Sequence, residues 1–122
     1  MHNPSLRVLV AENQYLIAME VEQILLDAIA CTTTIIPSAR LQDHLRDNAF
    51  DLVLLDCVRT QALNLSRARL VQESGAALIF LSSYDEGAAE LCGDASYPLV
   101  QKPIQAEDLI RAVQAVTART SA

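Results

Sequence analysis

The sequence lacks the features of secreted, membrane and disulfide-rich proteins. Its three cysteines are odd in number and widely spaced, so neither a disulfide framework nor a paired-cysteine metal site is indicated. No apolar run approaches the roughly 20 residues that span a bilayer, and the first residues carry neither the basic flank nor the apolar core of a signal peptide. The sequence therefore predicts a cytoplasmic protein without membrane contact.

Basic residues are also scarce. Nine Lys and Arg stand against fifteen Asp and Glu, which gives a formal net charge of −6 at pH 7. A surface that binds nucleic acid needs an excess of positive charge opposite the phosphates. Direct nucleic acid binding is therefore not expected, and the balance favours a protein partner or a bound cation. The only lysine is Lys102, which makes that position conspicuous.

The length and composition predict one soluble domain over residues 1–122. A chain of 122 residues, 52% of them hydrophobic, can bury about two-thirds of its unfolded surface without disulfide bonds or structural metals. Neither repeats nor linkers divide it. We expect no second domain and no effector tail within these residues.

Strand and helix patterns alternate along the chain. Four strand patterns are apolar or β-branched runs, which is typical of strands in a parallel sheet, and a fifth contains a proline. The expected strands are 6–11, 31–36, 52–56, 76–81 and 97–101. Apolar residues recur at helical spacing between them and after the last strand. The expected helices are 14–29, 38–48, 58–74, 85–92 and 105–119. This order predicts an α/β fold with one doubly wound, five-stranded parallel sheet and five helices.

Polar side chains stand where four of these strands end. Parallel strands deliver such residues to one crevice at their carboxyl edge. An Asp at this position also suits a helix cap, and a serine or a lysine alone is a weak signal. Together they form an oxygen-rich site suited to Mg²⁺, in which an ionised Asp can attack phosphorus. The residues are Glu12 and Asn13, Asp56, Ser82, and Lys102. Asn13 could also cap the helix that follows it.

The chain resembles the receiver domain of two-component response regulators, with a chemotaxis-regulator-like fold. The resemblance covers nearly the whole sequence, and the Lys-Pro pair after an Asp-terminated strand is its most specific element. It is carried by Val8-Leu9-Val10-Ala11-Glu12-Asn13, Asp51-Leu52-Val53-Leu54-Leu55-Asp56, Leu81-Ser82-Ser83-Tyr84 and Gln101-Lys102-Pro103.

The resemblance implies a flavodoxin-like sheet of strand order 2-1-3-4-5 and a role for each matched residue. Asp56 would accept a phosphoryl group in a Mg²⁺-dependent reaction from a histidine kinase or phosphotransfer protein. Lys102 would pair with the phosphoryl group, and Ser82 would sense its oxygen. The switch positions would be Ser82 and Leu99, and a cis bond would join Lys102 to Pro103. The metal ligands would be Glu12, Asn13, Asp56 and the backbone carbonyl of Val58.

Three departures from the family pattern bear on function. Asn13 stands where the family usually has an acid, so weak Mg²⁺ binding is expected. Leu99 replaces an aromatic residue that often switches between two rotamers, and we expect Tyr97 on the opposite strand face. The segment 57–64 lacks the usual Pro and Gly, so helix 58–74 could begin early or its start could be mobile.

Two functions remain in competition. The first is a working receiver that signals to a downstream protein through its fourth helix, fifth strand and fifth helix, a face that also permits a homodimer. The second is a pseudo-receiver that binds partners without phosphorylation. Neither is an enzyme beyond self-catalysed phosphorylation and dephosphorylation. A haloacid dehalogenase-type phosphatase needs an Asp where Val58 stands, and a Rossmann domain needs a Gly-rich turn after the first strand.

Overall fold

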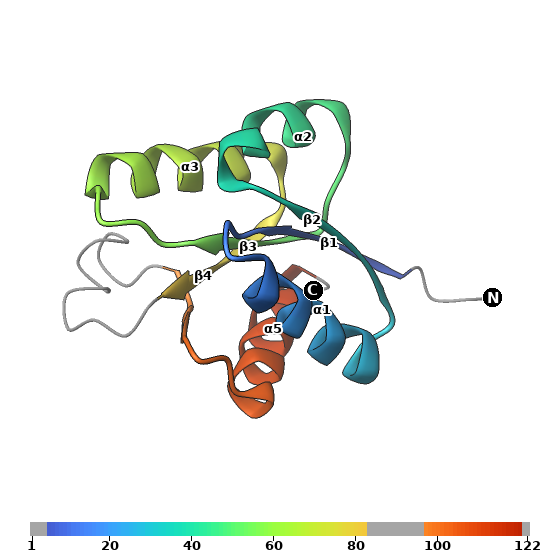
Figure 1. The fold of residues 1–122 in the computed structure, drawn as a ribbon. Helices are drawn as coiled ribbons and strands as arrows, with labels where there is room; N and C mark the ends of the chain where they lie inside the picture. The colour runs from blue at the N-terminus through green and yellow to red at the C-terminus, as the bar shows by residue number, and fades with distance from the viewer. Residues whose placement is uncertain (1–4, 83–96, 121–122) are drawn as a thin grey trace.

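The computed structural model describes residues 5–82 and 97–120, and strands and helices alternate through both segments. The predicted strands and helices are present within a few residues of the expected bounds wherever the chain is described (Figure 1). The elements are β1 Leu6–Ala11, α1 Tyr15–Ala28, β2 Cys31–Ile36, the 3₁₀ turn η1 Ser38–Arg40, α2 Leu41–Asp47, β3 Leu52–Asp56, α3 Gln61–Ser74, β4 Ala77–Ser82, β5 Leu99–Gln101 and α5 Ala106–Thr120.

The five strands form one parallel sheet in the order β2-β1-β3-β4-β5, which confirms the expected topology. α2 and α3 lie on one face of the sheet, and α1 and α5 lie on the other (Figure 1). Four of the five expected helices are present, and the remaining one, expected at 85–92, lies outside the described residues. The central position of β3 places the end of that strand in the middle of the carboxyl edge.

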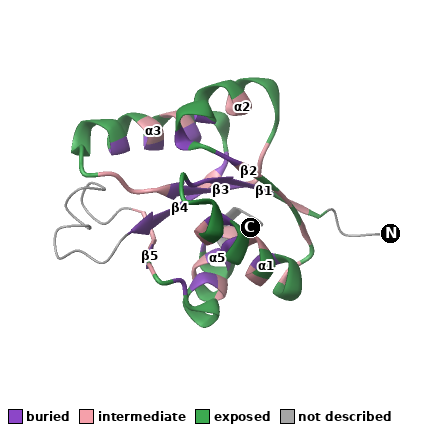
Figure 2. Ribbon diagram, viewed as in Figure 1, coloured by how far each residue is buried: buried purple, intermediate pink, exposed green. Residues whose placement is uncertain are grey.

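Alternate residues of the central strands feed two separate hydrophobic clusters. Val8 and Leu54 belong to the cluster beneath α1 and α5. Leu9 and Leu55 belong to the cluster beneath α2 and α3. Successive residues of a strand point to opposite faces, so β3 is buried from both sides (Figure 2). This explains why its sequence is continuously apolar rather than alternating.

An ion pair at the opposite edge of the sheet holds β1 against the start of β3. The Asp51 carboxylate accepts hydrogen bonds from the Arg7 backbone N–H at 2.8 Å and from its guanidinium at 3.0 and 3.1 Å. The Asp51 N–H in turn donates to the Arg7 carbonyl at 2.8 Å. Hydrogen bonds from the Arg7 side chain and backbone hold the pKa of Asp51 below its usual range. The contact fixes the β1–β3 register, which sets how Glu12 and Asp56 line up at the far ends.

Among residues 5–82 and 97–120, no helix is both long enough and apolar enough to cross a membrane.

Gly75 ends α3 and allows a prediction about stability. Its φ of +88° is left-handed, and a Cβ added there would meet no heavy atom of the described residues within 4 Å apart from its chain neighbours, so backbone strain is what opposes a side chain. Gly75→Ala should lower the free energy of unfolding by about 1 kcal/mol. Gly75→Asn should lose less, because Asn tolerates this conformation better. Urea unfolding followed by circular dichroism measures both, and an Ala variant as stable as wild type would contradict the explanation.

Candidate functional site

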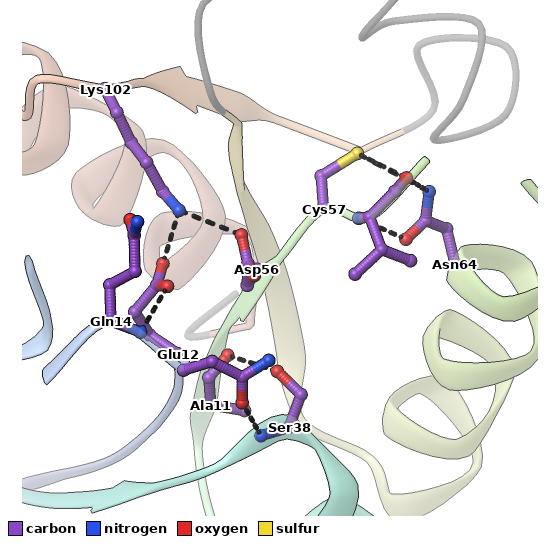
Figure 3. A network of polar contacts seen from close by, with 10 residues as sticks. Ala11, Glu12, Gln14, Ser38, Asp56, Cys57, Asn64 and Lys102 are labelled. Carbon is purple, nitrogen blue, oxygen red and sulfur yellow. Dashed lines mark hydrogen bonds and ion pairs between the residues drawn. The ribbon is translucent and has the colours of Figure 1, made fainter. Parts of the chain in front are cut away.

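Four of the predicted site residues meet at the carboxyl edge of the sheet. Glu12 follows β1, Asp56 is the last residue of β3, Ser82 is the last residue of β4, and Lys102 follows β5. The side chains of Glu12, Asp56 and Lys102 point toward one another (Figure 3). Parallel pairing of neighbouring strands produces this convergence, because all of these strands end at the same edge.

Lys102 is the cation of this group. Its Nζ donates a hydrogen bond to Asp56 Oδ1 at 2.9 Å and lies 2.7 Å from Glu12 Oε1. The side chains are largely withdrawn from water, with exposures of 9% for Lys102, 0% for Glu12 and 15% for Asp56. Burial has the largest single effect on the pKa of Lys102 and lowers it, but the contacts with Glu12 and Asp56 together outweigh burial and leave the pKa raised. The ammonium form is therefore the stable one in this site.

Glu12 is held by a backbone hydrogen bond as well as by its ion pair with Lys102. Its Oε2 accepts the backbone N–H of Gln14 at 3.0 Å. The contact of Oε1 with Lys102 is an ion pair by distance, although its direction is not that of a hydrogen bond, so Oε1 has no hydrogen-bond partner within the described part of the chain. A buried carboxylate oxygen of this kind can accept a further donor or a cation.

Ser82 and Lys102 are joined through the backbone. The Lys102 N–H donates to the Ser82 carbonyl at 2.8 Å, and Ser82 stands opposite Gln101 in the β4–β5 register. Ser82 is buried, at 2% exposure. The peptide bond between Lys102 and Pro103 is cis, as predicted. The sequence thus located the serine and the lysine at neighbouring strand ends.

Asn13 occupies a different position from the one its sequence context suggests. Its side-chain oxygen accepts the backbone N–H of Ser38 at 2.9 Å, at the start of η1. The expectation that Asn13 caps α1 is therefore wrong: Gln14 is the N-cap and makes no side-chain capping hydrogen bond. Asn13 is exposed, and its one acceptor atom is already used by a backbone group outside the cluster formed by Glu12, Asp56 and Lys102.

Sequence reasoning missed Asn64, a residue of α3 that holds the loop after Asp56. α3 begins at Gln61, so the expectation of a helix from 58 was wrong at its start. Asn64, which is fully buried, pairs with both backbone polar groups of Val58, whose carbonyl was a predicted metal ligand. The spacing of Asn64 with Ala68 and Val71 is consistent with a place on the inward face of α3, but nothing in the local sequence indicated its partner.

Leu99 and Tyr97 lie on the same side of the sheet. Both pack against the cluster beneath α2 and α3. The expectation of opposite faces was wrong, because residues two apart in an extended chain share a face. Tyr97 makes an edge-to-face contact with Phe80, with ring centroids 5.9 Å apart, and its hydroxyl lies 3.3 Å from Gln72 Oε1. Tyr97 therefore faces α3.

The described residues partly fit a divalent cation. Oxygen ligands suit Mg²⁺. Lys102 contacts both the Asp56 carboxylate and Glu12 Oε1, which has no hydrogen-bond partner among the described residues. The two carboxylates therefore lie close together. No group of three His, Cys, Asp or Glu gathers as a metal site within residues 5–82 and 97–120. The remaining proposed ligands are the Asn13 amide and the Val58 carbonyl, and both oxygens already accept hydrogen bonds.

Comparison with known proteins identifies the fold. No family model and no curated protein matches the sequence. A response regulator receiver protein from Sinorhizobium medicae is similar in structure, with a TM-score of 0.78, 22% identity, and coverage of 92% of this chain and 94% of that one. A response regulator from Thermotoga maritima has a TM-score of 0.80, 18% identity, and coverage of 94% and 99%.

A third similar structure contains a metal. It is the receiver domain of a sensor histidine kinase from Pseudomonas aeruginosa, with a magnesium ion coordinated in its active site cleft. It has a TM-score of 0.77 and 19% identity, and the alignment covers 94% of this chain and 99% of that one. These similarities establish that the chain has the receiver fold.

The ion pairs of Lys102 allow a stability prediction. Lys102→Met leaves two carboxylates facing each other without their cation, and should lower the free energy of unfolding at pH 7 by at least about 2 kcal/mol in the presence of a metal chelator. The loss should be smaller when the same change is made in Asp56→Asn, because one of the two charges is then absent. Denaturant unfolding of the four proteins gives this double-mutant cycle.

The raised pKa of Lys102 determines how its contribution to the free energy of unfolding changes with pH. Its contribution to stability is fully present below the unfolded-state pKa of about 10.4 and is lost as the pH rises through the higher folded-state value. The stability difference between wild type and Lys102→Met should therefore persist at neutral pH and narrow in strongly alkaline solution. A difference that is already small at neutral pH would show that the ion pairs contribute little.

Proposed function

We propose that this chain, which has the receiver fold, is a two-component receiver whose Asp56 accepts a phosphoryl group from a histidine kinase or phosphotransfer protein. The observation that supports this most is the contact of Lys102 with both Asp56 and Glu12 at the carboxyl edge of the sheet. This arrangement gives a carboxylate at the strand end that is 15% exposed and has a fixed cation beside it. The cytoplasm is the proposed location of the reaction.

The proposed reaction is a phosphoryl transfer between two nucleophiles. An oxygen of the Asp56 carboxylate forms a bond to phosphorus as the phosphorus–nitrogen bond of a donor phosphohistidine breaks, and the bonding electrons return to the imidazole. Transfer of this kind depends on positioning and on stabilising charge at the phosphoryl oxygens. Lys102 is already 2.9 Å from Asp56 Oδ1 and supplies one positive charge there. A divalent cation, when bound, would supply the rest of the charge stabilisation.

Ser82 is the proposed sensor of the phosphoryl group. It ends β4 beside the strand that carries Asp56, and its carbonyl already accepts the N–H of Lys102. A hydroxyl that moves to contact a phosphoryl oxygen would also displace the β4 end relative to β5. The proposed signal therefore begins at Ser82 and reaches Leu99, the first residue of β5.

The proposed output surface includes β5 and α5. A hollow of about 320 Å³ lies between them and has both charged and apolar walls. A downstream protein, or a second copy of the chain, would contact this surface after phosphorylation. Its lining is Leu99, Val100, Gln101, Asp108, Arg111, Ala112 and Ala115. The fourth helix of the expected surface lies outside the described residues.

The start of α1 is the proposed contact for a protein phosphodonor. Tyr15, Leu16 and Met19 are large apolar side chains that are 63%, 81% and 44% exposed. They begin three residues after Glu12, so a protein that covers Asp56 would also cover them. Apolar side chains that lose water on contact provide much of the binding energy in protein interfaces.

A phosphorylation-independent interaction module is the second candidate function. Asn13 supplies no charge to the site, and its oxygen is bound to the Ser38 N–H. Lys102 neutralises one of the two remaining carboxylates. Both features weaken the attraction for a divalent cation, and a receiver that cannot bind the cation would present one constant surface to its partners.

Phosphorylation of Asp56 is directly testable. Incubation with Mg²⁺ and acetyl phosphate should add one phosphoryl mass to wild type and none to Asp56→Asn, because the carboxylate is the nucleophile. Asn13→Asp should reach the same extent of modification at a lower Mg²⁺ concentration, because it adds a charged ligand. Intact-protein mass spectrometry measures all three. No adduct in wild type at millimolar Mg²⁺, with an adduct in Asn13→Asp, would favour the interaction module.

The proposed α1 contact predicts that alanine substitutions of two exposed leucines have different effects on the rate of phosphoryl transfer. Leu16→Ala should slow transfer from a phosphorylated histidine protein by about tenfold, which corresponds to the loss of about 1.4 kcal/mol of contact energy. Leu26→Ala is the matched control, because Leu26 is 49% exposed on the same helix but lies about 15 Å further along its axis. Both variants should react with acetyl phosphate as wild type does. Equal transfer rates for the two variants would rule out this contact.

A further inference from the structure

Asn64 is an amide buried among apolar residues. It begins the inward-facing stripe of α3, where Ala68 and Val71 follow it at helical spacing, and it is 0% exposed. A buried carboxamide is costly unless its donor and acceptor atoms are both used. Those of Asn64 are used by the loop that follows Asp56.

The contacts of Asn64 hold Val58 at both of its backbone polar groups. The Val58 N–H donates to Asn64 Oδ1 at 2.9 Å, and Asn64 Nδ2 donates to the Val58 carbonyl at 2.7 Å. Asn64 Nδ2 is also 3.5 Å from the sulfur of Cys57. One side chain therefore fixes the conformation of residues 57 and 58, in a loop that contains neither Gly nor Pro.

The position of Asn64 relative to Asp56 determines which way the Val58 carbonyl points. Asn64 and Cys57 lie on the side of Asp56 that faces α3, whereas Lys102 lies on the other side (Figure 3). The Val58 carbonyl that Asn64 Nδ2 holds is therefore drawn toward α3. The same carbonyl is the uncharged backbone ligand that the resemblance to receiver domains implies.

We propose that Asn64 controls divalent cation binding by holding the Val58 carbonyl in a hydrogen bond to α3. The inference rests on the proposed function, because it concerns the cation site of the same reaction. A carbonyl oxygen can accept more than one partner, but this one is turned toward α3 by Asn64 Nδ2, so it can face the carboxylates of the site only when that hydrogen bond opens. Asn64 is a positioning residue in this proposal, since it acts through Val58.

A purely structural role for Asn64 makes the opposite prediction. If the amide only shaped the loop, its removal would loosen residues 57 and 58 and leave cation affinity unchanged or weaker. If Asn64 withholds the Val58 carbonyl, its removal tightens cation binding. The sign of the change in Mg²⁺ affinity therefore separates the two roles.

A Mg²⁺ titration of the ¹⁵N-labelled wild type is the first test. The side-chain NH₂ resonances of Asn64 should shift along the same binding curve as the backbone amide of Cys57. The NH₂ group of Asn48, which donates to the His44 carbonyl at the end of α2, is the internal control and should not move. A site that saturates while the Asn64 side chain stays unchanged would overturn the proposal.

Two variants provide the second test. Asn64→Ala and Asn64→Ser should each bind Mg²⁺ about five-fold more tightly than wild type, which corresponds to the loss of one ordinary hydrogen bond that competes for the oxygen. Circular dichroism establishes that each variant is folded. Equal or weaker binding in a folded variant, or no binding in either wild type or variants, contradicts the proposal. If neither variant folds, the wild-type titration decides alone.

These measurements are independent of phosphoryl transfer. If acetyl phosphate fails to modify Asp56 while Mg²⁺ still shifts the Asn64 side chain, the proposed function fails and the inference about Asn64 stands. If Asp56 is modified but the Asn64 side chain does not respond to Mg²⁺, the proposed function stands and the inference about Asn64 fails.

Discussion

One ammonium group between two carboxylates is the interaction on which the rest of the site depends. Lys102, Glu12 and Asp56 come from three strand ends, and none of them could be buried alone without a large cost in solvation. Their pairing makes it possible for three charges to sit at the edge of an apolar sheet. The same pairing places the carboxylate of Asp56, the proposed phosphoacceptor, beside a fixed positive charge, so the stability of this edge and its proposed chemistry depend on one arrangement.

The order of the elements could be predicted because the sequence encodes it locally. The apolar run of β3 and the helical spacing in α5 are each readable within one segment. The meeting of Glu12, Asp56, Ser82 and Lys102 then follows from topology, since parallel strands end at a common edge. The fold and most of the cluster were therefore accessible without coordinates.

The parts that could not be predicted depend on pairings between a side chain and a distant backbone group. Asn13 looked like a helix cap, but its side-chain oxygen accepts the N–H of Ser38, 25 residues away. Asn64 was not singled out from the sequence, but it fixes the loop that contains Val58. Local propensity carries no information about such partners, because the tertiary structure brings them together.

Because β3 is buried on both faces, a change at its end affects the helices on both sides of the sheet. Leu54 packs toward α1 and α5, and Leu55 packs toward α2 and α3. Close-packed interiors resist small displacements, so a shift of Asp56 along the strand axis strains both layers at once. A displacement at the end of β3 would therefore reach the helices on both faces of the sheet at once.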